Sequence, residues 1–199
     1  MSTPRRRPAR DAELLAGSVR AFAARGYFGT STAQVAAEMG VSQPYVIRTF
    51  GSKLELFVRT HAFAAAEIVE VFRAAMIAGF DGDRLGAAYR ELVLSNPAAL
   101  LVWAHAFSAA TAEPAIGAES RRQFDDVYRT LRDAGASDAE LWAFMGRGML
   151  INNLLLMEAP RYSRDYDFAP LIDLVFGARP PLPPHPALPA PPPPRSGVT

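Results

Sequence analysis

The sequence predicts an all-α fold of about nine helices, and two observations carry this prediction. Apolar residues recur along the 199-residue chain with the 3.6-residue period of a helix, and no useful length alternates with the two-residue period of a strand. Helix-start signals also recur. They include two capping boxes, Ser52–Glu55 and Ser137–Glu140, in which a serine and a glutamate satisfy free backbone N–H groups reciprocally.

The first predicted helix spans about residues 10–25 and places Leu15, Val19 and Phe22 on one face. Gly26 is expected to end this helix, because glycine readily adopts the left-handed conformation that closes many helices. A turn then leads into a pair of shorter helices.

Of this pair, the first helix covers about residues 32–39, and Gly40 is suited to the left-handed turn that follows it. Ser42 is a favoured cap for the second, and Pro44 fits its first turn because that turn has free N–H groups anyway. Six apolar residues are expected to lock the pair together: Val35, Ala36, Met39, Val41, Val46 and Phe50. With the longer preceding helix, the pair forms a three-helix unit of the helix-turn-helix type.

The capping box at Ser52 begins a long helix that is expected to reach about Gly79. At 1.5 Å per residue this helix would be roughly 40 Å long, enough to link two lobes of the molecule. Later helices begin at the segments SNP, EP, SDAE and DFAP, and the last of them ends at Gly177.

These signals divide the chain into three parts. Residues 8–55 form the predicted helix-turn-helix domain, and residues 56–178 form a larger helical domain. Residues 179–199 are rich in proline and nearly devoid of large apolar side chains, so we expect a disordered, extended tail.

Charge is distributed unevenly along the chain. Residues 1–53 carry seven arginines and one lysine against three carboxylates, a net charge of +5, whereas the remainder carries −4. The first quarter of the chain is therefore suited to contact a polyanion, and the rest is not.

Several classes of protein are disfavoured by composition. The chain has no cysteine, and its three histidines are far apart, so we expect no disulfide, metal site or cofactor. An enzyme on a helical bundle would need converging carboxylates with histidine, or a nucleophile–base pair, and the sequence shows neither, so we expect no catalytic residues. The basic amino terminus lacks the apolar core of a signal peptide, and polar residues interrupt the most apolar stretch, residues 141–157. We expect no membrane association and a location in a bacterial cytoplasm, at the nucleoid.

The second short helix presents an unusual outer face. Gln43, Pro44, Tyr45, Arg48 and Thr49 are expected to face solvent once its apolar anchors are buried. A helix fits the major groove of B-DNA, where glutamine can read adenine and arginine can read guanine or hold a phosphate. We therefore predict that this helix reads DNA.

Other polar residues are placed to hold the DNA backbone. Thr30, Ser31 and Thr32 offer hydroxyl and free N–H groups at a helix start, and Lys53 is expected to contact the next phosphate. A flexible arm with Arg5, Arg6 and Arg7 is predicted to enter the minor groove or follow the phosphates.

The segment from Ala9 to Phe57 resembles the DNA-binding domain of the tetracycline-repressor (TetR) family of bacterial regulators. The resemblance is carried by FAARGYFGTSTAQVAAEMGVSQPYVIRTFGSKLELF, which follows the family pattern nearly throughout. It implies an all-helical homodimer with an amino-terminal DNA-binding domain and a carboxyl-terminal ligand-binding and dimerisation domain. One position departs from the pattern: Ile47 occupies the place where the family commonly has a phosphate-contacting tyrosine.

The larger domain is rich in bulky apolar side chains, which predicts a largely apolar cavity for a hydrophobic or aromatic small molecule. Any one of these side chains is more often core than pocket, and His105 and Tyr128 are the candidate polar anchors. The predicted ligand-binding residues are Phe72, Met76, Trp103, His105, Phe107, Phe124, Tyr128 and Met145.

Two late helices are predicted to form a four-helix bundle with a second copy of the chain. The segment ELWAFMGRGMLINNLLLMEA is apolar on most of its circumference, so it should be covered on two sides. The predicted dimerisation residues are Leu141, Met145, Gly148, Asn152, Leu155, Leu171, Leu174 and Val175. A dimer would place two recognition helices about 34–36 Å apart and so read a palindromic operator in double-stranded DNA.

The sequence thus predicts a transcriptional regulator, most simply a repressor released from its operator by a small apolar effector. Two alternatives stay open at this stage. The chain could bind DNA independently of any ligand, as an architectural protein does, which would require a filled carboxyl-terminal core. It could also activate transcription with the same fold.

Overall fold

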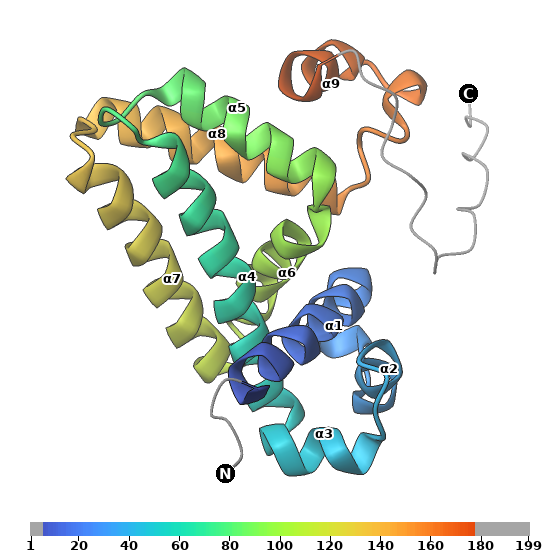
Figure 1. Cartoon of the computed structure of the whole chain (residues 1–199). Coiled ribbons are helices and arrows are strands. Elements are labelled where there is room, and N and C mark those ends of the chain that lie inside the picture. Colours follow the sequence, from blue (N-terminus) through green and yellow to red (C-terminus); the bar gives the residue numbers. More distant parts are fainter. Residues whose placement is uncertain (1–5, 178–199) are drawn as a thin grey trace, which may run out of the picture.

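The computed structural model describes the backbone of residues 6–177 and the side chains of residues 10–177. Arg5 and the predicted disordered tail, residues 179–199, lie outside the described residues. Within the described range the fold consists of nine α-helices and one short 3-10 helix, without a strand, which confirms the predicted all-α class (Figure 1). The helices are α1 (Arg6–Gly29), α2 (Thr32–Glu38), α3 (Gln43–Phe50), α4 (Lys53–Ala75), α5 (Gly82–Ser95), α6 (Pro97–Ala109), α7 (Pro114–Asp133), α8 (Asp138–Leu156) and α9 (Ala169–Phe176), with the 3-10 helix at Ser163–Asp165.

Helix α1 is interrupted where the sequence predicts its end. Gly26 has φ 64° and ψ −171°, which is not helical, and a last turn continues from there to Gly29. A side chain at Gly26 would lie 2.9 Å from Nδ1 of His105 on α6. Glycine is therefore required at this position both by the backbone conformation and by the close approach of α6.

The caps of the two short helices follow the predicted pattern. Ser42 accepts a hydrogen bond from the backbone N–H of Tyr45 at the start of α3, and Pro44 occupies its first turn. Gly40 adopts a left-handed conformation with φ 67° in the turn between α2 and α3. Ser31 begins α2 with a capping box that it shares with Gln34.

Helix α4 begins with the predicted capping box between Ser52 and Glu55 and ends at Ala75, four residues earlier than expected. The reason lies in Asp81, whose carboxylate accepts hydrogen bonds from the N–H groups of Asp83 and Arg84 and starts α5. Residues between these helices form a turn, and Phe80 N–H donates to the carbonyl of Ala134 in the loop before α8. The capping box at Ser137 is also present.

Two hydrophobic cores hold the molecule together. The first lies among α1–α4 and contains Phe22 and Phe57, whose rings pack edge to face with centroids 4.9 Å apart. It also includes Ala99, Val102 and Ala106 of α6, so α6 closes the core of the amino-terminal helices. The second core lies among α4–α9.

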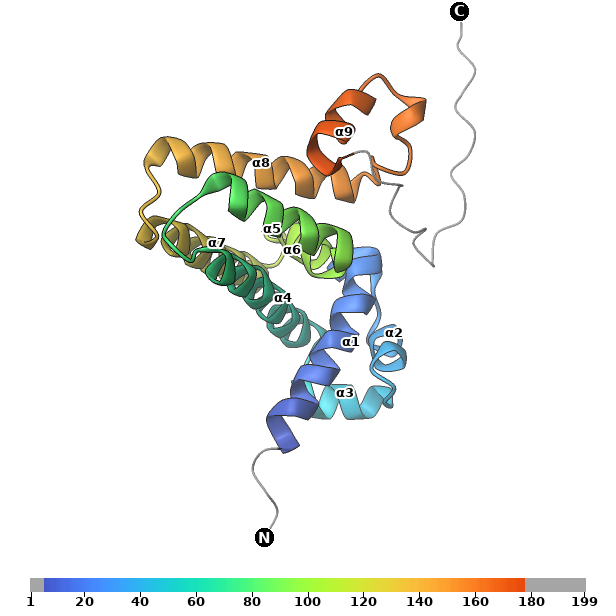
Figure 2. The ribbon, with the colours of Figure 1, turned by 45° about the horizontal axis from the view of Figure 1, so that its top comes forward.

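The helix-turn-helix unit and the helices α5 and α8 lie at opposite ends of the molecule. Helices α1, α2 and α3 gather at the lower end in Figure 1, while α5 and α8 lie side by side at the opposite end in Figures 1 and 2. Helix α9 stands at one end of α8 (Figure 2). Among the described helices none has the length and hydropathy to cross a membrane by itself, and only α5 and α6 together would pass, as a pair bent by 98°.

Candidate functional site

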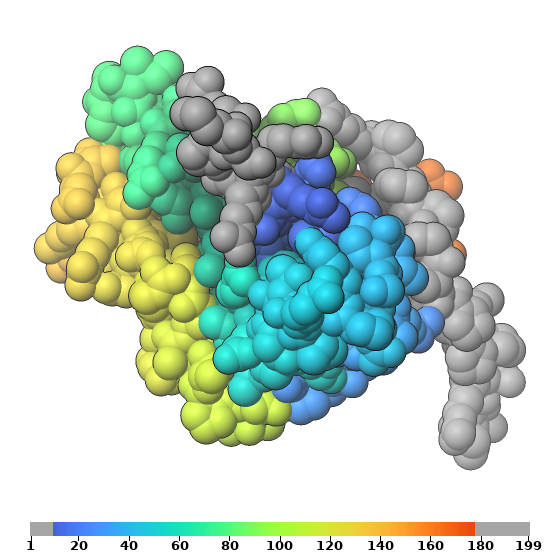
Figure 3. All heavy atoms as spheres, turned by 60° about the horizontal axis from the view of Figure 1, so that its bottom comes forward, coloured from blue at the N-terminus to red at the C-terminus, as the bar shows by residue number. Residues whose placement is uncertain are grey.

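Helix α3 lies on the outer end of the molecule, where it and α2 form a continuous surface (Figure 3). Val46 and Phe50 are only 1% and 4% exposed and anchor the helix in the amino-terminal core. Gln43, Pro44 and Arg48 face solvent, as the sequence predicts. Ile47 is also exposed.

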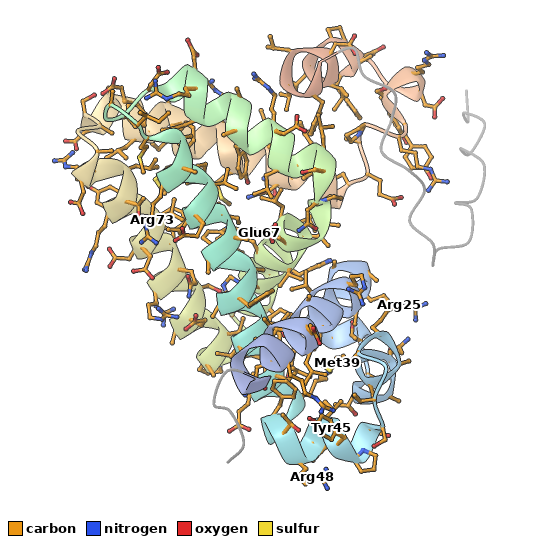
Figure 4. The ribbon with its side chains drawn as sticks, viewed as in Figure 1. Arg25, Met39, Tyr45, Arg48, Glu67 and Arg73 are labelled. Atoms are coloured by element: carbon orange, nitrogen blue, oxygen red, sulfur yellow. The ribbon has the colours of Figure 1, made fainter. Side chains whose placement is uncertain are left out.

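Tyr45 is half-buried at the centre of this surface. The guanidinium of Arg48 lies 5.5 Å from the centroid of its ring, and that of Arg10, on α1, lies 5.6 Å from it. Both contacts are cation–π interactions, which restrict the positions of the two charges relative to the ring. Tyr45 therefore connects a cation of α1 with one of α3. Tyr45 and Arg48 lie at the lower end of the molecule in Figure 4.

The starts of α2 and α3 are joined by a side-chain hydrogen bond. Nε2 of Gln43 donates to Oγ1 of Thr32 at 2.8 Å, and the Gln43 side chain remains exposed. Thr49, near the end of α3, is half-buried, and Ser31 is exposed at its capping box. These residues lie on one surface, so the structure brings together most of the predicted DNA-contacting set.

Thr30 and Lys53 are engaged inside the fold. The hydroxyl of the buried Thr30 donates to the carbonyl of Gly26 at 2.7 Å. Nζ of Lys53 donates to the carbonyls of Tyr27 and Thr30 at 3.0 and 3.2 Å, and lies 4.4 Å from the centroid of the Tyr27 ring. These carbonyls account for a lysine at the start of α4 without a bound anion, although the ammonium keeps a third proton for another acceptor.

The basic arm enters the structure at α1. Arg6 and Arg7 lie in its first turn, and their side chains, like all of Arg5, are outside the described residues. Arg10 is the first arginine whose side chain is described, and it is exposed beside Tyr45.

A cavity of about 450 Å³ lies in the larger part of the molecule, between α4, α5, α6, α7, α8 and α9. Four of the eight predicted ligand-binding residues line it: Phe72, Trp103, Phe124 and Met145. Its size and mainly apolar walls are typical of small-molecule sites.

The other four predicted ligand-binding residues lie elsewhere. Met76 follows the last turn of α4, and Nε2 of His105 is 3.2 Å from the carbonyl of Ala23 on α1. Phe107 and Tyr128 border a shallower hollow between α6 and α7. Phe107 still supports the cavity wall indirectly, because its ring packs edge to face against Trp103 with centroids 5.5 Å apart.

The polar groups of the cavity were not predicted. Tyr89 donates its hydroxyl to Oδ1 of Asn152 at 2.8 Å, and burial raises the pKa of Tyr89, so the hydroxyl stays protonated. Arg90 of α5 and Arg147 of α8 also line the cavity. One signal could have found Arg147: it is the only charged residue of the apolar stretch 141–157.

Half of the predicted dimerisation residues are buried inside the subunit, three of them on α8 and one on α9. Leu141, Asn152, Leu155 and Val175 are at most 8% exposed, whereas Met145, Gly148 and Leu171 are half-buried at the cavity. Leu174 of α9 is 78% exposed. The outward stripe of α8 instead contains Trp142, Gly146, Leu150, Asn153 and Met157.

His61 is a buried group next to the cavity wall. Its ring packs edge to face against Trp103, and neither ring nitrogen has a hydrogen-bond partner. Burial lowers the pKa of His61 to about 4, the nearby Glu119 opposes this shift and Arg122 reinforces it. The imidazole is therefore neutral at pH 7.

We expect this histidine to make stability depend on pH. Between pH 6.5 and about 4 the unfolded chain takes up a proton on His61 that the folded chain does not, so stability falls as pH falls. A shift of this size corresponds to roughly 3 kcal/mol over that window. Urea unfolding at pH 7 and pH 5 measures the loss, and His61→Phe should show a shallower pH dependence than the native chain. An equal dependence in both proteins would contradict the assignment.

The described residues contain no group of three or more histidine, aspartate or glutamate side chains that could hold a metal ion. The exposed, basic helix-turn-helix end and the apolar cavity behind it define the class of this protein as an all-helical, DNA-binding transcriptional regulator.

Residues 14–60 match the sequence profile described as bacterial regulatory proteins, tetR family. Residues 14–60 are therefore a helix-turn-helix domain of the tetR type. No curated protein matches the chain in sequence.

Solved structures with the same fold extend the likeness over most of the chain. The fatty acid degradation regulator FadR from Bacillus halodurans is similar with a TM-score of 0.60 and 13% identity, over 82% of this chain and 94% of that one. A TetR-like transcriptional regulator from Rhodococcus sp. RHA1 has a TM-score of 0.57 and 19% identity, over 88% and 94%. A transcriptional regulator from Saccharomonospora viridis, solved in complex with choline, has a TM-score of 0.55 and 21% identity, over 74% and 83%.

Proposed function

We propose that the protein is a transcriptional repressor that binds a palindromic operator as a homodimer and leaves it when a small effector fills the cavity. The observation that carries this proposal is the outer face of α3. Gln43, Pro44 and Arg48 are exposed and Tyr45 is half-buried between two arginines, while apolar anchors hold the helix from behind. We assign this face to the major groove and the starts of α2 and α4 to the phosphates.

Dimerisation would use the outward stripe of α8 together with Leu174 of α9. Trp142, Met157 and Leu174 are large apolar side chains that are 83%, 62% and 78% exposed in the single chain. A second copy of the chain would bury them and place the second α3 in a successive major groove. The predicted division at residues 55 and 56 becomes, in this proposal, a division between reading DNA and binding effector and partner.

The effector would act through the helices that the two ends share. On α6, Trp103 lines the cavity, and His105 two residues later lies against the carbonyl of Ala23 on α1. On α4, Phe72 lines the cavity at one end, and Lys53 is bonded to the end of α1 at the other. A shift of either helix would therefore move α3. A hundredfold preference of the effector for the non-matching state supplies about 2.7 kcal/mol of coupling.

The cavity favours this reading over a ligand-independent DNA-binding protein, which would have a filled core. That the related Saccharomonospora viridis protein was solved with choline supports a small-molecule site in the same fold. We assign no catalytic role and place the protein at the nucleoid in the bacterial cytoplasm.

Selection of bound sequences from random duplex DNA tests this function directly. The purified full-length chain should enrich an inverted repeat whose half-sites lie one helical turn, or a multiple, apart. Repeating the selection with a bound cavity ligand should remove the enrichment. Failure to enrich any sequence, or enrichment of an isolated half-site, would contradict the proposal.

A further inference from the structure

The cavity carries charge of one sign. Arg90 and Arg147 are the charged residues among those that line it, and no aspartate or glutamate joins them. Neither arginine has a hydrogen bond or ion pair with any described residue. Five other arginines, on α4, α5 and α7, are each paired with a carboxylate: Arg73, Arg84, Arg122, Arg129 and Arg132.

The two guanidinium groups are brought near one stretch of α5. A side chain built at Gly86 would lie 3.9 Å from Nη1 of Arg147, so this arginine of α8 reaches across to α5. Gly86 and Arg90 are four residues apart and therefore share a face of the helix. Gly86 leaves open space between two unpaired cations, which suits an anion.

Arg147 also borders a shallower hollow with Asp81, Asp83 and Glu140. None of these carboxylates lies within ion-pairing distance of its guanidinium. The charge of Arg147 is therefore not neutralised from this side by a described residue.

The side chain of Asn152 also offers hydrogen-bond donors to the cavity. Oδ1 of Asn152 accepts the hydroxyl proton of Tyr89, so the NH2 group of Asn152 is left to donate. The remaining wall is aromatic and aliphatic, with Phe72, Trp103 and Phe144 among its members. The lining of the site thus combines hydrogen-bond donors and positive charge with a large apolar wall.

We propose that the effector is an amphipathic carboxylate, with its head group held by Arg90 and Arg147 and its apolar body against the aromatic wall of the cavity. This inference rests on the proposed function only in naming the ligand as its effector. Planar guanidinium groups match carboxylates with paired, charge-assisted hydrogen bonds. The side chain of Arg90 is half-buried and that of Arg147 is exposed, so both can be reached by a ligand that enters the cavity. A neutral or cationic molecule of the same shape would leave both cations unpaired.

Calorimetric titration of the full-length protein with three twelve-carbon probes tests the proposal without DNA. Dodecanoate should bind once per subunit, dodecanol at least tenfold more weakly, and dodecylamine not measurably. Equal affinity for dodecanoate and dodecanol, or no binding of dodecanoate, would overturn the proposal.

Substitutions locate the head group. Arg90→Gln and Arg147→Gln should each weaken dodecanoate at least tenfold and leave dodecanol unchanged, whereas Arg90→Lys should retain part of the affinity. Arg73→Gln is the matched control, because this arginine is exposed and paired with Glu70 outside the cavity. An unchanged dodecanoate affinity in both cavity variants would overturn the assignment.

The same probes separate this inference from the proposed function. If dodecanoate binds through the two arginines but does not release operator DNA, the ligand class stands and the effector role fails. If a neutral apolar compound releases the protein from operator DNA while dodecanoate does not bind, the proposed regulator function is supported and the proposal of a carboxylate ligand is contradicted.

Discussion

Arg48→Ala is expected to abolish specific operator binding while leaving the fold intact. The side chain is exposed on α3 and its guanidinium lies 5.5 Å from the centre of the Tyr45 ring, so nothing in the core depends on it. A bidentate contact to a base is worth about 1–3 kcal/mol, and a dimer loses two of them, so affinity should fall between about 30-fold and about 10⁴-fold. Tyr45→Ala should act in the same direction, because it removes the ring that positions both Arg48 and Arg10.

Fluorescence anisotropy with the selected operator measures this loss, and thermal unfolding followed by circular dichroism should show an unchanged midpoint for Arg48→Ala. Arg73→Ala provides a matched control, since it removes an exposed arginine at the far end of α4. Operator affinity that stays the same in both the Arg48 and the Tyr45 variant would falsify the assignment of α3 to the groove.

Trp142→Glu is expected to dissociate the homodimer. The indole is 83% exposed in the single chain and lies on the outward stripe of α8. Tryptophan at the centre of an interface typically contributes 2 kcal/mol or more, and twofold symmetry places two copies there, so dimer affinity should fall roughly 1,000-fold. Because two half-sites need two recognition helices, operator affinity should fall with it.

Sedimentation velocity over a range of protein concentrations reports the monomer–dimer equilibrium. Phe28→Glu is the control, because Phe28 is an aromatic residue that is also largely exposed, at 63%, but lies at the end of α1. If the Trp142→Glu protein sediments as a dimer at the same concentrations as the native chain, the prediction that α8 forms the dimer interface is wrong.

The amino-terminal helices could be predicted closely from the sequence because their signals are local. A cap residue such as Ser42, a glycine such as Gly40 and apolar anchors such as Val46 act within a few residues of each other. The exposure of α3 followed from the same spacing. The structure places Gln43 and Arg48 at the surface, as expected.

The carboxyl-terminal helices were harder to predict because their faces are alike. Helix α8 is apolar nearly all round, so the pattern could not show which side packs inward, and Leu141 and Leu155 proved to be core while Trp142 faces solvent. Contacts between residues far apart in the chain could not be predicted from the sequence pattern either. Lys53 bonds to carbonyls more than twenty residues earlier in the chain, and Arg90 meets the cavity only after α5 and α8 pack.

The part played by α6 in the amino-terminal core limits how such regulators can be recombined. Val102 and Ala106 are fully buried among residues of α1–α4, and Ile116 of α7 joins them. A hybrid that joins residues 1–55 of this chain to the remainder of a relative would bring together surfaces that were never matched. To give a regulator a new DNA specificity by domain exchange, the residues of α6 that pack against α1–α4 must therefore be exchanged together with those helices.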